Sequence, residues 1–470
     1  MCLLHALALS AKDFGVGLHV GHLHHHMRAQ ADSDAKMVSD FAADLGIRCT
    51  VGHADVPDLA RSLGVGLEEA GRIARYRFLR ELKSEIGASK IALGHNLNDQ
   101  AETVLMRLFR GAGTEGLAGI PGAKGDLIRP LLDVPRALIE EYCREQGIPT
   151  ITDVYNLDVK YTRNLIRHEV LPYLAERFNP SLPLSLARSA AAMRWDADFL
   201  SAVAEEAFLA SSFACGRVTM VERRAIDEMP RAIYSRVLEL AWRECAGSDD
   251  NLPIERAMDL MLCPVGSVSL PGGVTAEKTS KWVGFYPPPP KGLEVGLLPG
   301  RMTYIPDLRL SVETRIVDAS TAKWGDRERN EGPSGAAAAT EAPSVPWLLE
   351  PVAHLDYNKL AEEIRLRTRR PGDRFAPLGM GGKEQKLQDF FVQRRVPRGY
   401  RDFVPLLVSG GKIAWVAGMR IGEEFRVTPE TRLVLEISVR PYLRHSRNCA
   451  TIWWSCPTAV GPTSETRGGV

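Results

Sequence analysis

The first 150 residues of the sequence predict an α/β fold built on a doubly wound, parallel sheet. Short stretches with apolar residues at alternate positions are followed by longer stretches in which apolar residues recur at helical spacing. Three such strand–helix pairs precede residue 115. Repeated pairs of this kind place their strands in a parallel sheet with helices on its faces.

The first two pairs are defined by their apolar periodicity. Residues 15–23 (GVGLHVGHL) alternate valine and leucine with other residues, which predicts a strand. A helix is expected over 32–47, where Gly46 can close it. The second strand is expected over 47–56, and the second helix over 67–87, with acidic residues near its start and a glycine after its end.

The third pair and its continuation complete the predicted sheet. Residues 90–96 read as a strand and 99–113 as a helix, and 128–149 give a short strand and then a helix that begins near a proline. Ligands of doubly wound sheets bind at the carboxyl ends of the strands. Residues 22–28 and 94–100 both occupy such positions.

The remaining chain divides into segments of different composition. A PPPP run at 287–290 marks a boundary, and 326–344 is rich in glycine, alanine and charge without bulky apolar residues. The expected parts are a core over 1–180, a helical middle domain over 181–290, a connecting segment over 291–345 that contains a flexible linker at 326–344, a small mixed α/β C-terminal domain over 346–440, and a disordered tail over 441–470.

The overall composition excludes few functions. The chain has 59 Lys and Arg against 58 Asp and Glu, so any polyanion contact must come from local patches. No apolar run is as long as a membrane span, which needs about 18 residues. The N-terminal residues lack the features of a secretory signal. Eight cysteines without a C-x-x-C pair indicate reduced thiols in a cytosolic protein.

The stretch HLHHHMR (22–28) places four histidines in five positions. Imidazole is a common ligand of transition metals, which makes a metallohydrolase one alternative. At the end of a strand, however, alternate side chains point to opposite faces, so the four rings do not converge without a bend. We expect this stretch to line a ligand crevice.

The helix within 94–111 carries two carboxylates close to its N-terminus. The polar side contains Asp99, Glu102, Thr103 and Arg110, roughly opposite an apolar stripe of Ala101, Val104, Leu105 and Leu108. The free N–H groups of such a helix favour an anion, and two carboxylates beside a phosphate suit Mg²⁺. The alternative is a solvated helix face held by salt bridges.

Two basic clusters could contact phosphate. Arg75 and Arg77 lie on the helix expected over 67–87, and an arginine in a crevice can clamp phosphate in a bidentate manner. Farther along, 163–168 (RNLIRH) combines arginine, asparagine and histidine, which suits a phosphate backbone. Ordinary surface charge is the alternative for both.

Several of these stretches, in their order and spacing, resemble the tRNA(Ile)-lysidine synthetase family of the N-type ATP-pyrophosphatase (PP-loop) superfamily. The matching stretches are HLHHHMR, ARYRFL (74–79), LGHNLNDQAETVLMRLFRGAG (93–113), IRPLLDVPR (128–136) and YTRNLIRHEVLP (161–172), with RRPGDRFAPLGMGGKEQKLQDFFVQRRVPRGYRDFVPLL (369–407) and IAWVAGMRIGEEFRVT (413–428) in the third unit. The resemblance covers roughly 1–180 and 346–440 strongly, and the middle region more loosely.

The resemblance implies a reaction and its partners. Such enzymes use ATP to adenylate the wobble cytidine of a tRNA(Ile) with a CAU anticodon and release pyrophosphate. Free L-lysine then displaces AMP to give lysidine. The resemblance further implies ATP and Mg²⁺ as cofactors, a cytoplasmic location, and a tRNA-binding C-terminal domain, and it leaves a homodimer open.

The resemblance also assigns roles to individual residues. Catalytic roles fall to Asp99, Glu102 and Arg75, with Asp99 and Glu102 as the expected Mg²⁺ ligands. The expected lining of the ATP or substrate pocket is His22, His24, His25, Arg28, His95, Asn96 and Thr103. The residues expected to contact tRNA are Arg110, Arg129, Arg163, Asn164 and Arg167 in the core, and Arg365, Arg367, Arg369, Arg370, Arg374, Lys383, Lys386, Arg394, Arg395, Arg398 and Arg401 in the C-terminal domain.

One departure from the family pattern bears on activity. The S-G-G-x-D-S loop of the superfamily, which cradles pyrophosphate, has no counterpart here. Either the sequence starts at an internal methionine, or the protein is a remnant that binds tRNA without adenylating it. In both cases we expect weak or no ligase activity from the chain as written. The SGGK stretch at 409–412 lies between two apolar runs, so we predict a hairpin turn there. Other PP-loop tRNA-modifying enzymes are nearer alternatives, although thiolases of this type tend to carry C-x-x-C pairs.

Overall fold

The computed structural model describes residues 1–25, 31–150, 161–248, 250–320 and 352–441. The chain forms two compact units, residues 1–200 (unit 1) and 201–470 (unit 2). Each is described separately below. Within the described ranges, no helix is long and apolar enough to cross a membrane.

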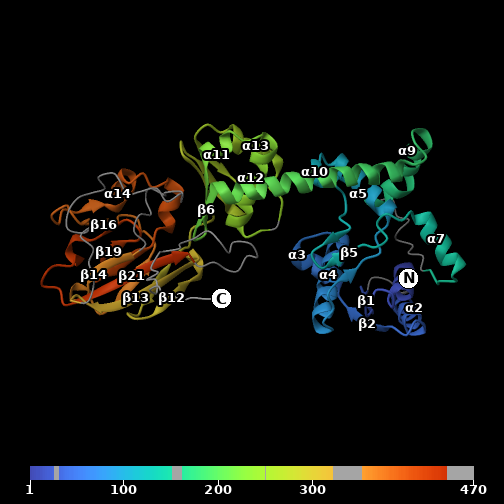
Figure 1. Cartoon of the computed structure of the whole chain (residues 1–470), viewed down its shortest axis with the longest axis horizontal. Helices are drawn as coiled ribbons and strands as arrows, with labels where there is room; N and C mark the ends of the chain where they lie inside the picture. The colour runs from blue at the N-terminus through green and yellow to red at the C-terminus, as the bar shows by residue number, and fades with distance from the viewer. Residues whose placement is uncertain (26–30, 151–160, 249, 321–351, 442–470) are drawn as a thin grey trace, which may run out of the picture. The chain divides into compact units, whose positions relative to one another are not determined.

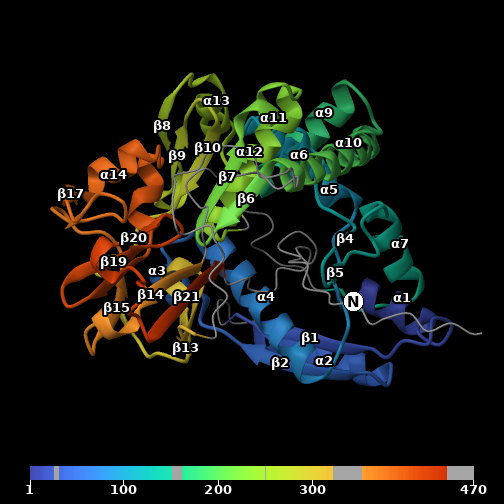
Figure 2. The ribbon, with the colours of Figure 1, turned by 60° about the vertical axis from the view of Figure 1, so that its left-hand side comes forward.

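Unit 1 begins with helix α1 (Cys2–Ser10) and the parallel strand pair β1 (His19–His24) and β2 (Arg48–His53). The strands are joined by α2 (Ala31–Asp44), which packs against both of them (Figure 2). The first strand starts later than expected, because the chain before it turns at Gly15, whose φ is 62°. The parallel pairing through a helix confirms the predicted α/β class.

Two helices precede the next strand. The first, α3 (Val56–Leu63), was not expected from periodicity; Asp55 caps its N-terminus and a left-handed Gly64 ends it. The second, α4 (Leu67–Glu85), coincides with the expected helix. It packs on β1, where a Cβ at Gly21 would lie 2.9 Å from Leu79 of α4.

A separate three-stranded sheet of unit 1 contains strands β3 (Ile91–Ala92), β4 (Ala123–Lys124) and β5 (Leu127–Ile128), in the order β3-β5-β4. β3 and β5 are parallel, and β4 is antiparallel to β5. α4 contacts both β1 and β3, so one helix covers both parallel pairs. The intervening helices are α5 (Leu97–Phe109) and α6 (Thr114–Leu117), and α7 (Arg136–Glu145) follows β5.

The end of unit 1 packs against α5. α8 (Thr162–Leu165) continues into a π-helical turn (Ile166–Val170) and α9 (Leu171–Arg177), and the long helix α10 (Leu182–Ser211) follows. Ala101 and Leu105 of α5 form a buried cluster with Ile166 and Leu171. This apolar contact fixes where the segment 162–171 lies on α5.

The middle region contains more strand than we expected. A helical domain was predicted over 181–290, but a five-stranded antiparallel sheet with the order β6-β7-β10-β9-β8 accompanies the helices. Its strands are only four or five residues long, and all five residues of β10 are buried, so the alternating strand pattern is absent. The elements are β6 (Ser212–Cys215), β7 (Val218–Glu222), α11 (Arg223–Asp227), α12 (Arg231–Ala246), α13 (Ile254–Leu262), β8 (Gly266–Ser269), β9 (Thr275–Lys278) and β10 (Trp282–Tyr286).

The last part of unit 2 holds a five-stranded sheet with the order β11-β15-β18-β19-β20 and a four-stranded sheet with the order β12-β13-β21-β14 (Figure 1). A two-stranded sheet, β16-β17, and helix α14 complete it. The elements are β11 (Glu294–Leu297), β12 (Met302–Ile305), β13 (Leu310–Asp318), β14 (Val352–Asp356), β15 (Ile364–Arg367), β16 (Arg374–Phe375), β17 (Gln385–Lys386), α14 (Leu387–Gln393), β18 (Leu406–Ser409), β19 (Lys412–Val416), β20 (Arg420–Ile421) and β21 (Leu433–Pro441).

This part corrects the predicted connecting segment. Over 291–318 the chain is not a connector, because β11 pairs with β15 and β13 pairs with β21 along nine residues. These pairings join residues far apart in the sequence, which local periodicity does not reveal. The expected linker at 326–344 and the tail after 441 lie outside the described residues. The hairpin at 409–412 is confirmed, since Ser409 pairs with Lys412 across two glycines of positive φ.

Candidate active site

The start of α5 is fixed by a capping box. Asn96 accepts a hydrogen bond from the Asp99 backbone N–H (3.0 Å), and Asp99 Oδ2 accepts one from the Asn96 N–H (2.9 Å). Thr103, one turn later, donates its hydroxyl to the Asp99 carbonyl (2.8 Å). Three residues expected at the ATP site or in catalysis therefore shape the N-terminus of this helix.

Glu102 lies on the next turn of α5 and is 1% exposed. Arg167 donates to both of its oxygens, through Nε (2.6 Å to Oε1) and Nη2 (2.9 Å to Oε2). Arg163 donates through Nε to Oε2 (2.9 Å). The alternative for this helix face, a solvated face held by salt bridges, agrees with the structure in its salt bridges but not in solvation, because Glu102 is buried.

Asp99 completes the cluster. Its Oδ1 accepts from Nη2 of both arginines, at 3.2 Å from Arg163 and 3.0 Å from Arg167. Two carboxylates thus face two guanidinium groups, and we call these four residues the ion cluster. Burial lowers the pKa of Arg167, but the hydrogen bond and charge of Glu102 and the charge of Asp99 outweigh it and raise the pKa overall.

A second group of charges surrounds His95, between β3 and α5. Burial lowers the pKa of His95; Asp99 opposes this effect, and Arg129, Arg163 and Arg75 reinforce it. Within the described residues, His95 Nδ1 and Arg129 Nε are buried without a hydrogen-bond partner. The imidazole is therefore neutral at pH 7, in a region of positive charge.

Asp99 and Glu102 do not fit a magnesium ion as they are arranged. Mg²⁺ favours carboxylates whose negative charge is not already neutralised. Both carboxylates here are paired with guanidinium groups, at 2.6–3.2 Å. In the described part of the chain, no group of three or more His, Cys, Asp or Glu side chains could hold a metal ion.

The histidine-rich stretch ends β1. His24 is buried, its Nε2 lies 3.2 Å from Asp32, and its ring centroid is 5.3 Å from that of His53, its partner in the strand pairing. His22 and His25 lie beside it in sequence at the carboxyl edge of the sheet, as expected. The expected pocket residue Arg28 lies outside the described residues.

The other expected residues of unit 1 are dispersed. Arg75 is exposed on α4 and forms no ion pair with a described residue. Arg110 is exposed at the C-terminus of α5, whereas Asn164 is buried. Leu108, which we expected in the apolar stripe, is 51% exposed, because the buried face of α5 stops short of its last turn.

Two residues that the sequence analysis missed organise the loop after α6. Gln100 accepts from the Ile120 N–H (2.6 Å) and donates to the Ile120 carbonyl (3.1 Å). Arg107 donates to the carbonyls of Gly116 and Gly119. Gln100 and Arg107 lie on the same helix and give no distinctive signal in the sequence. In the structure, Gly119, whose φ is 64°, lies in the turn that they hold.

In unit 2, the basic residues expected to contact tRNA differ in burial and in ion pairing; Arg365, for example, pairs with Glu294 and Glu363. Arg367 is buried and binds Asp373 with both Nη atoms (2.8 Å each), so it is a structural residue. Arg369, Arg370 and Arg374 each pair with an acidic side chain. Of the expected residues, Lys383, Lys386, Arg395 and Arg398 are exposed and have no ion partner among the described residues.

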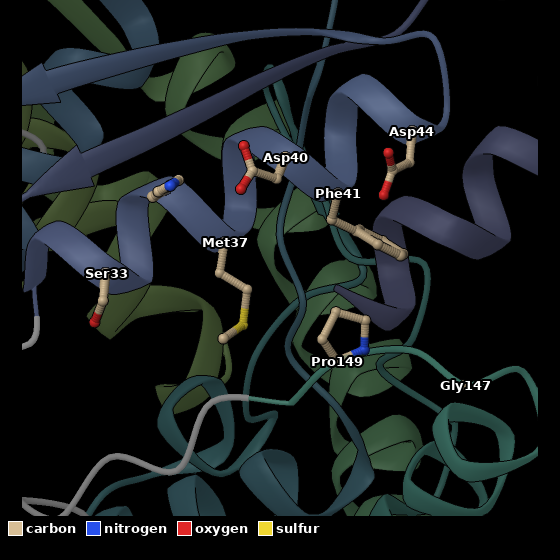
Figure 3. Close-up of a pocket in the computed structure, with 8 residues that line it drawn as sticks. Ser33, Met37, Asp40, Phe41, Asp44, Gly147 and Pro149 are labelled. Carbon is tan, nitrogen blue, oxygen red and sulfur yellow. The ribbon is translucent and has the colours of Figure 1, made fainter.

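A pocket of unit 1 lies apart from these residues (Figure 3). It is bounded by Ser33, Met37, Asp40, Phe41 and Asp44 of α2, with Gly147 and Pro149 opposite and Lys36 on the same helix. None of its lining residues was expected in the functional site.

The parallel strand pairs of unit 1, with polar side chains after the carboxyl ends of β1 and β3, define an α/β domain of the class that binds its ligands at the strand ends. Comparison with protein families gives the same class: residues 1–174 match the PP-loop domain, and residues 364–437 match the TilS substrate C-terminal domain. The chain belongs to the tRNA(Ile)-lysidine synthase family.

Relatives of this name align over nearly the whole chain. The protein of Caldanaerobacter subterraneus is 33% identical over 453 residues, which covers 93% of this chain and 90% of the relative. That of Symbiobacterium thermophilum is 34% identical over 465 residues (94% and 91%). The protein of Clostridium acetobutylicum is 30% identical over 456 residues (93% and 92%).

Proposed function

We propose that this protein is a tRNA(Ile)-lysidine synthase, a ligase that forms a carbon–nitrogen bond on tRNA at the expense of ATP. The similarity to enzymes of this name over 90% or more of their length carries the proposal. ATP first adenylates the C2 oxygen of the wobble cytidine and pyrophosphate leaves. The amine of free L-lysine then attacks C2, and AMP leaves.

The proposed nucleotide site is the crevice at the carboxyl ends of β1 and β3. Positive charge from Arg75 and Arg129 favours a polyphosphate there, and the N-terminus of α5 presents backbone N–H groups to an anion. His22, His24, His25 and His95 are the proposed lining. Asn96 and Thr103 would act indirectly, because their hydrogen bonds fix the geometry of the N-terminus of α5.

Mg²⁺ is also a proposed cofactor, since it would neutralise charge on the triphosphate during adenylation. Asp99 and Glu102 are the carboxylates at hand, but both are paired with the arginines of the ion cluster. We therefore derive no step of the reaction through the ion.

The proposed tRNA contacts lie in both units. In unit 1 they are Arg110, Arg129, Arg163, Asn164 and Arg167, and in unit 2 the exposed Lys383, Lys386, Arg395 and Arg398 with Arg369, Arg370 and Arg374. Neutralisation of phosphates supplies most of the affinity in such complexes. A homodimer is a further proposal, to be checked by light scattering.

The function is tested with the full chain, unmodified tRNA(Ile) transcripts and radiolabelled lysine. Because the chain as written has no S-G-G-x-D-S loop, we expect at most weak ATP-dependent incorporation of lysine, confined to the transcript with a CAU anticodon and absent from a matched UAU transcript. Binding of the CAU transcript without incorporation would favour the alternative, an inactive tRNA-binding member of the family. Incorporation of sulfur, or of lysine regardless of the anticodon, would contradict the proposal.

A further inference from the structure

Two cysteines of unit 1 meet where α1 packs against α7 (Figure 2). Cys2 lies in the first turn of α1, and Cys143 lies in the last turn of α7. Their thiol groups interact directly, although the two residues are far apart in the sequence. Both thiols are free in the structure.

A second contact between the same two helices fixes their relative position. His5 lies one turn after Cys2, and its Nδ1 shares a hydrogen bond of 2.8 Å with the Tyr142 hydroxyl. The centroids of these two rings are 5.7 Å apart, and the His5 ring lies 6.3 Å from that of Phe41 in α2. Because Tyr142 directly precedes Cys143, this contact holds the two thiols near each other.

The two thiols differ in their access to solvent. Cys143 is 6% exposed, whereas Cys2 is half-buried. Burial, and after it the charge and the hydrogen bond of Cys143, raise the pKa of the Cys2 thiol. A reagent in solution therefore reaches Cys2 first, and this thiol reacts more slowly than an ordinary exposed cysteine. The raised pKa slows oxidation, but the proximity of the second thiol favours the disulfide at equilibrium.

The other thiols for which the structure gives contacts are arranged differently. Cys215 is hydrogen-bonded to the Tyr400 hydroxyl, and Cys49 accepts a hydrogen bond from the Ser39 hydroxyl. Cys245 is enclosed, and burial raises its pKa to about 12. These thiols contact hydroxyl groups or are enclosed in the core, whereas Cys2 and Cys143 contact each other.

From this arrangement we propose that Cys2 and Cys143 are a site of reversible oxidation, where a disulfide joins α1 to α7 when the protein meets a small disulfide such as oxidised glutathione. Disulfides that form inside cells are commonly transient and respond to redox conditions. The reduced pair is the resting form, so the proposal agrees with our expectation of reduced thiols. It does not depend on the proposed function.

The oxidation consists of two thiol–disulfide exchange steps. The Cys2 thiolate attacks one sulfur of oxidised glutathione, and one glutathione leaves with the electron pair of the broken sulfur–sulfur bond. The Cys143 thiolate then attacks the Cys2 sulfur of the mixed disulfide and displaces the second glutathione. The two cysteine protons end on the two released glutathione thiols, so the protein is oxidised and the reagent is reduced.

The disulfide would connect two parts of unit 1 that are not joined by strand pairing. α1 contacts α2 through His5 and Phe41, and α2 packs on the β1–β2 pair. α7 follows β5, which belongs to the separate three-stranded sheet. The proposed nucleotide crevice lies at the ends of strands from both sheets. We therefore expect oxidation to restrict the relative motion of the two sheets.

The test uses the full-length protein in buffers of reduced or oxidised glutathione, followed by alkylation, digestion with trypsin and mass spectrometry. We expect peptides 1–12 and 137–144, which contain the two cysteines, to be joined in the oxidised buffer and separate in the reduced buffer. The joined pair should have lost two hydrogen atoms. The thermal unfolding midpoint of unit 1 should rise by about 5 °C on oxidation, because the disulfide restricts the unfolded chain.

Two variants and a control separate this disulfide from other effects of oxidation. Cys2→Ser and Cys143→Ala each remove one thiol, so neither variant should show the rise in the unfolding midpoint. Their midpoints in reduced buffer show whether they fold, and Cys2→Ser decides the test if Cys143→Ala does not. Cys49→Ser is the matched control, because Cys49 is a half-buried thiol of unit 1 whose partner is a hydroxyl. It should behave like the unaltered protein.

Several results would overturn the proposal. One is the absence of the joined peptides in the most oxidising buffer. Others are a disulfide between the Cys2 residues of two molecules, seen as a dimer on a non-reducing gel, and a mixed disulfide with glutathione that persists on Cys2. Joined peptides with an unchanged unfolding midpoint would contradict the restraint of α1 by α7. None of these results depends on lysine incorporation, which tests the proposed function separately.

Discussion

Arg167 donates two hydrogen bonds to Glu102, from Nε to Oε1 (2.6 Å) and from Nη2 to Oε2 (2.9 Å), and so joins the π-helical turn to α5. The carboxylate is almost completely buried. A buried carboxylate that loses its partner is costly, so this contact matters to stability as well as to binding.

We predict that Arg167→Met lowers the free energy of unfolding of unit 1 by about 3 kcal/mol, the lower end of the cost of breaking a buried ion pair, because Arg163 still faces Glu102. Urea unfolding followed by tryptophan fluorescence and circular dichroism measures the change. The double variant Arg167→Met with Glu102→Met should recover much of the loss, since no charge is then left buried. A loss below about 0.5 kcal/mol in the single variant, the size of an exposed ion pair, would contradict the prediction.

The Gln100 side chain supports the loop that contains Gly119. Gln100→Ala removes the acceptor for the Ile120 N–H and the donor to its carbonyl, and we expect a loss of about 1–3 kcal/mol in the free energy of unfolding. Hydrogen exchange should show faster exchange of the Ile120 amide. Asn98→Ala is a suitable control, because it removes a single exposed hydrogen bond to the Arg136 N–H. If Asn98→Ala lowers the free energy of unfolding as much as Gln100→Ala does, the two hydrogen bonds of Gln100 with Ile120 do not have the predicted effect.

His95 should give unit 1 a pH-dependent stability. Its pKa in the folded protein lies below the ordinary value of about 6.5, so the unfolded chain binds the proton more readily. Stability is then fully present above about pH 6.5 and falls as the pH drops toward the lowered pKa. Denaturation at several pH values between 5 and 7.5 should show this slope, and His95→Gln should reduce it. Equal slopes for both proteins would contradict the prediction.

The exposed basic residues of unit 2 should contribute to the salt dependence of tRNA binding. If Lys383 and Lys386 contact phosphates, the double change to glutamine should weaken binding and reduce the slope of log K against log salt by about 0.7–0.9 per lost contact. Titrations at several NaCl concentrations give the slope. Arg256→Gln is the matched control, because Arg256 is an exposed arginine of unit 2 outside the proposed tRNA surface. An unchanged slope for the lysine variant would remove these residues from the proposed tRNA surface.

Single helices and hairpins could be predicted from the sequence, because the residue pattern that defines each of them lies within a short stretch. The helix expected over 67–87 is observed as α4 at Leu67–Glu85, and the hairpin at 409–412 follows from two adjacent glycines between apolar runs. The expectation failed where strands are short and wholly buried, as in β10, or where a strand pairs with a distant one, as β13 does with β21. Neither kind of strand produces an alternating pattern of apolar and polar residues that would predict it from the sequence.

The sequence by itself determined the alternation of strands and helices, the family, and the presence of Asp99, Glu102, Arg163 and Arg167 among the candidate site residues. Only the tertiary structure decided that the two arginines bind the two carboxylates. Periodicity tells which face of a helix is apolar, but the partner of a polar face depends on what packs beside it. Here the contact of Ile166 and Leu171 with α5 brings the arginines onto Glu102, and burial makes that pairing strong.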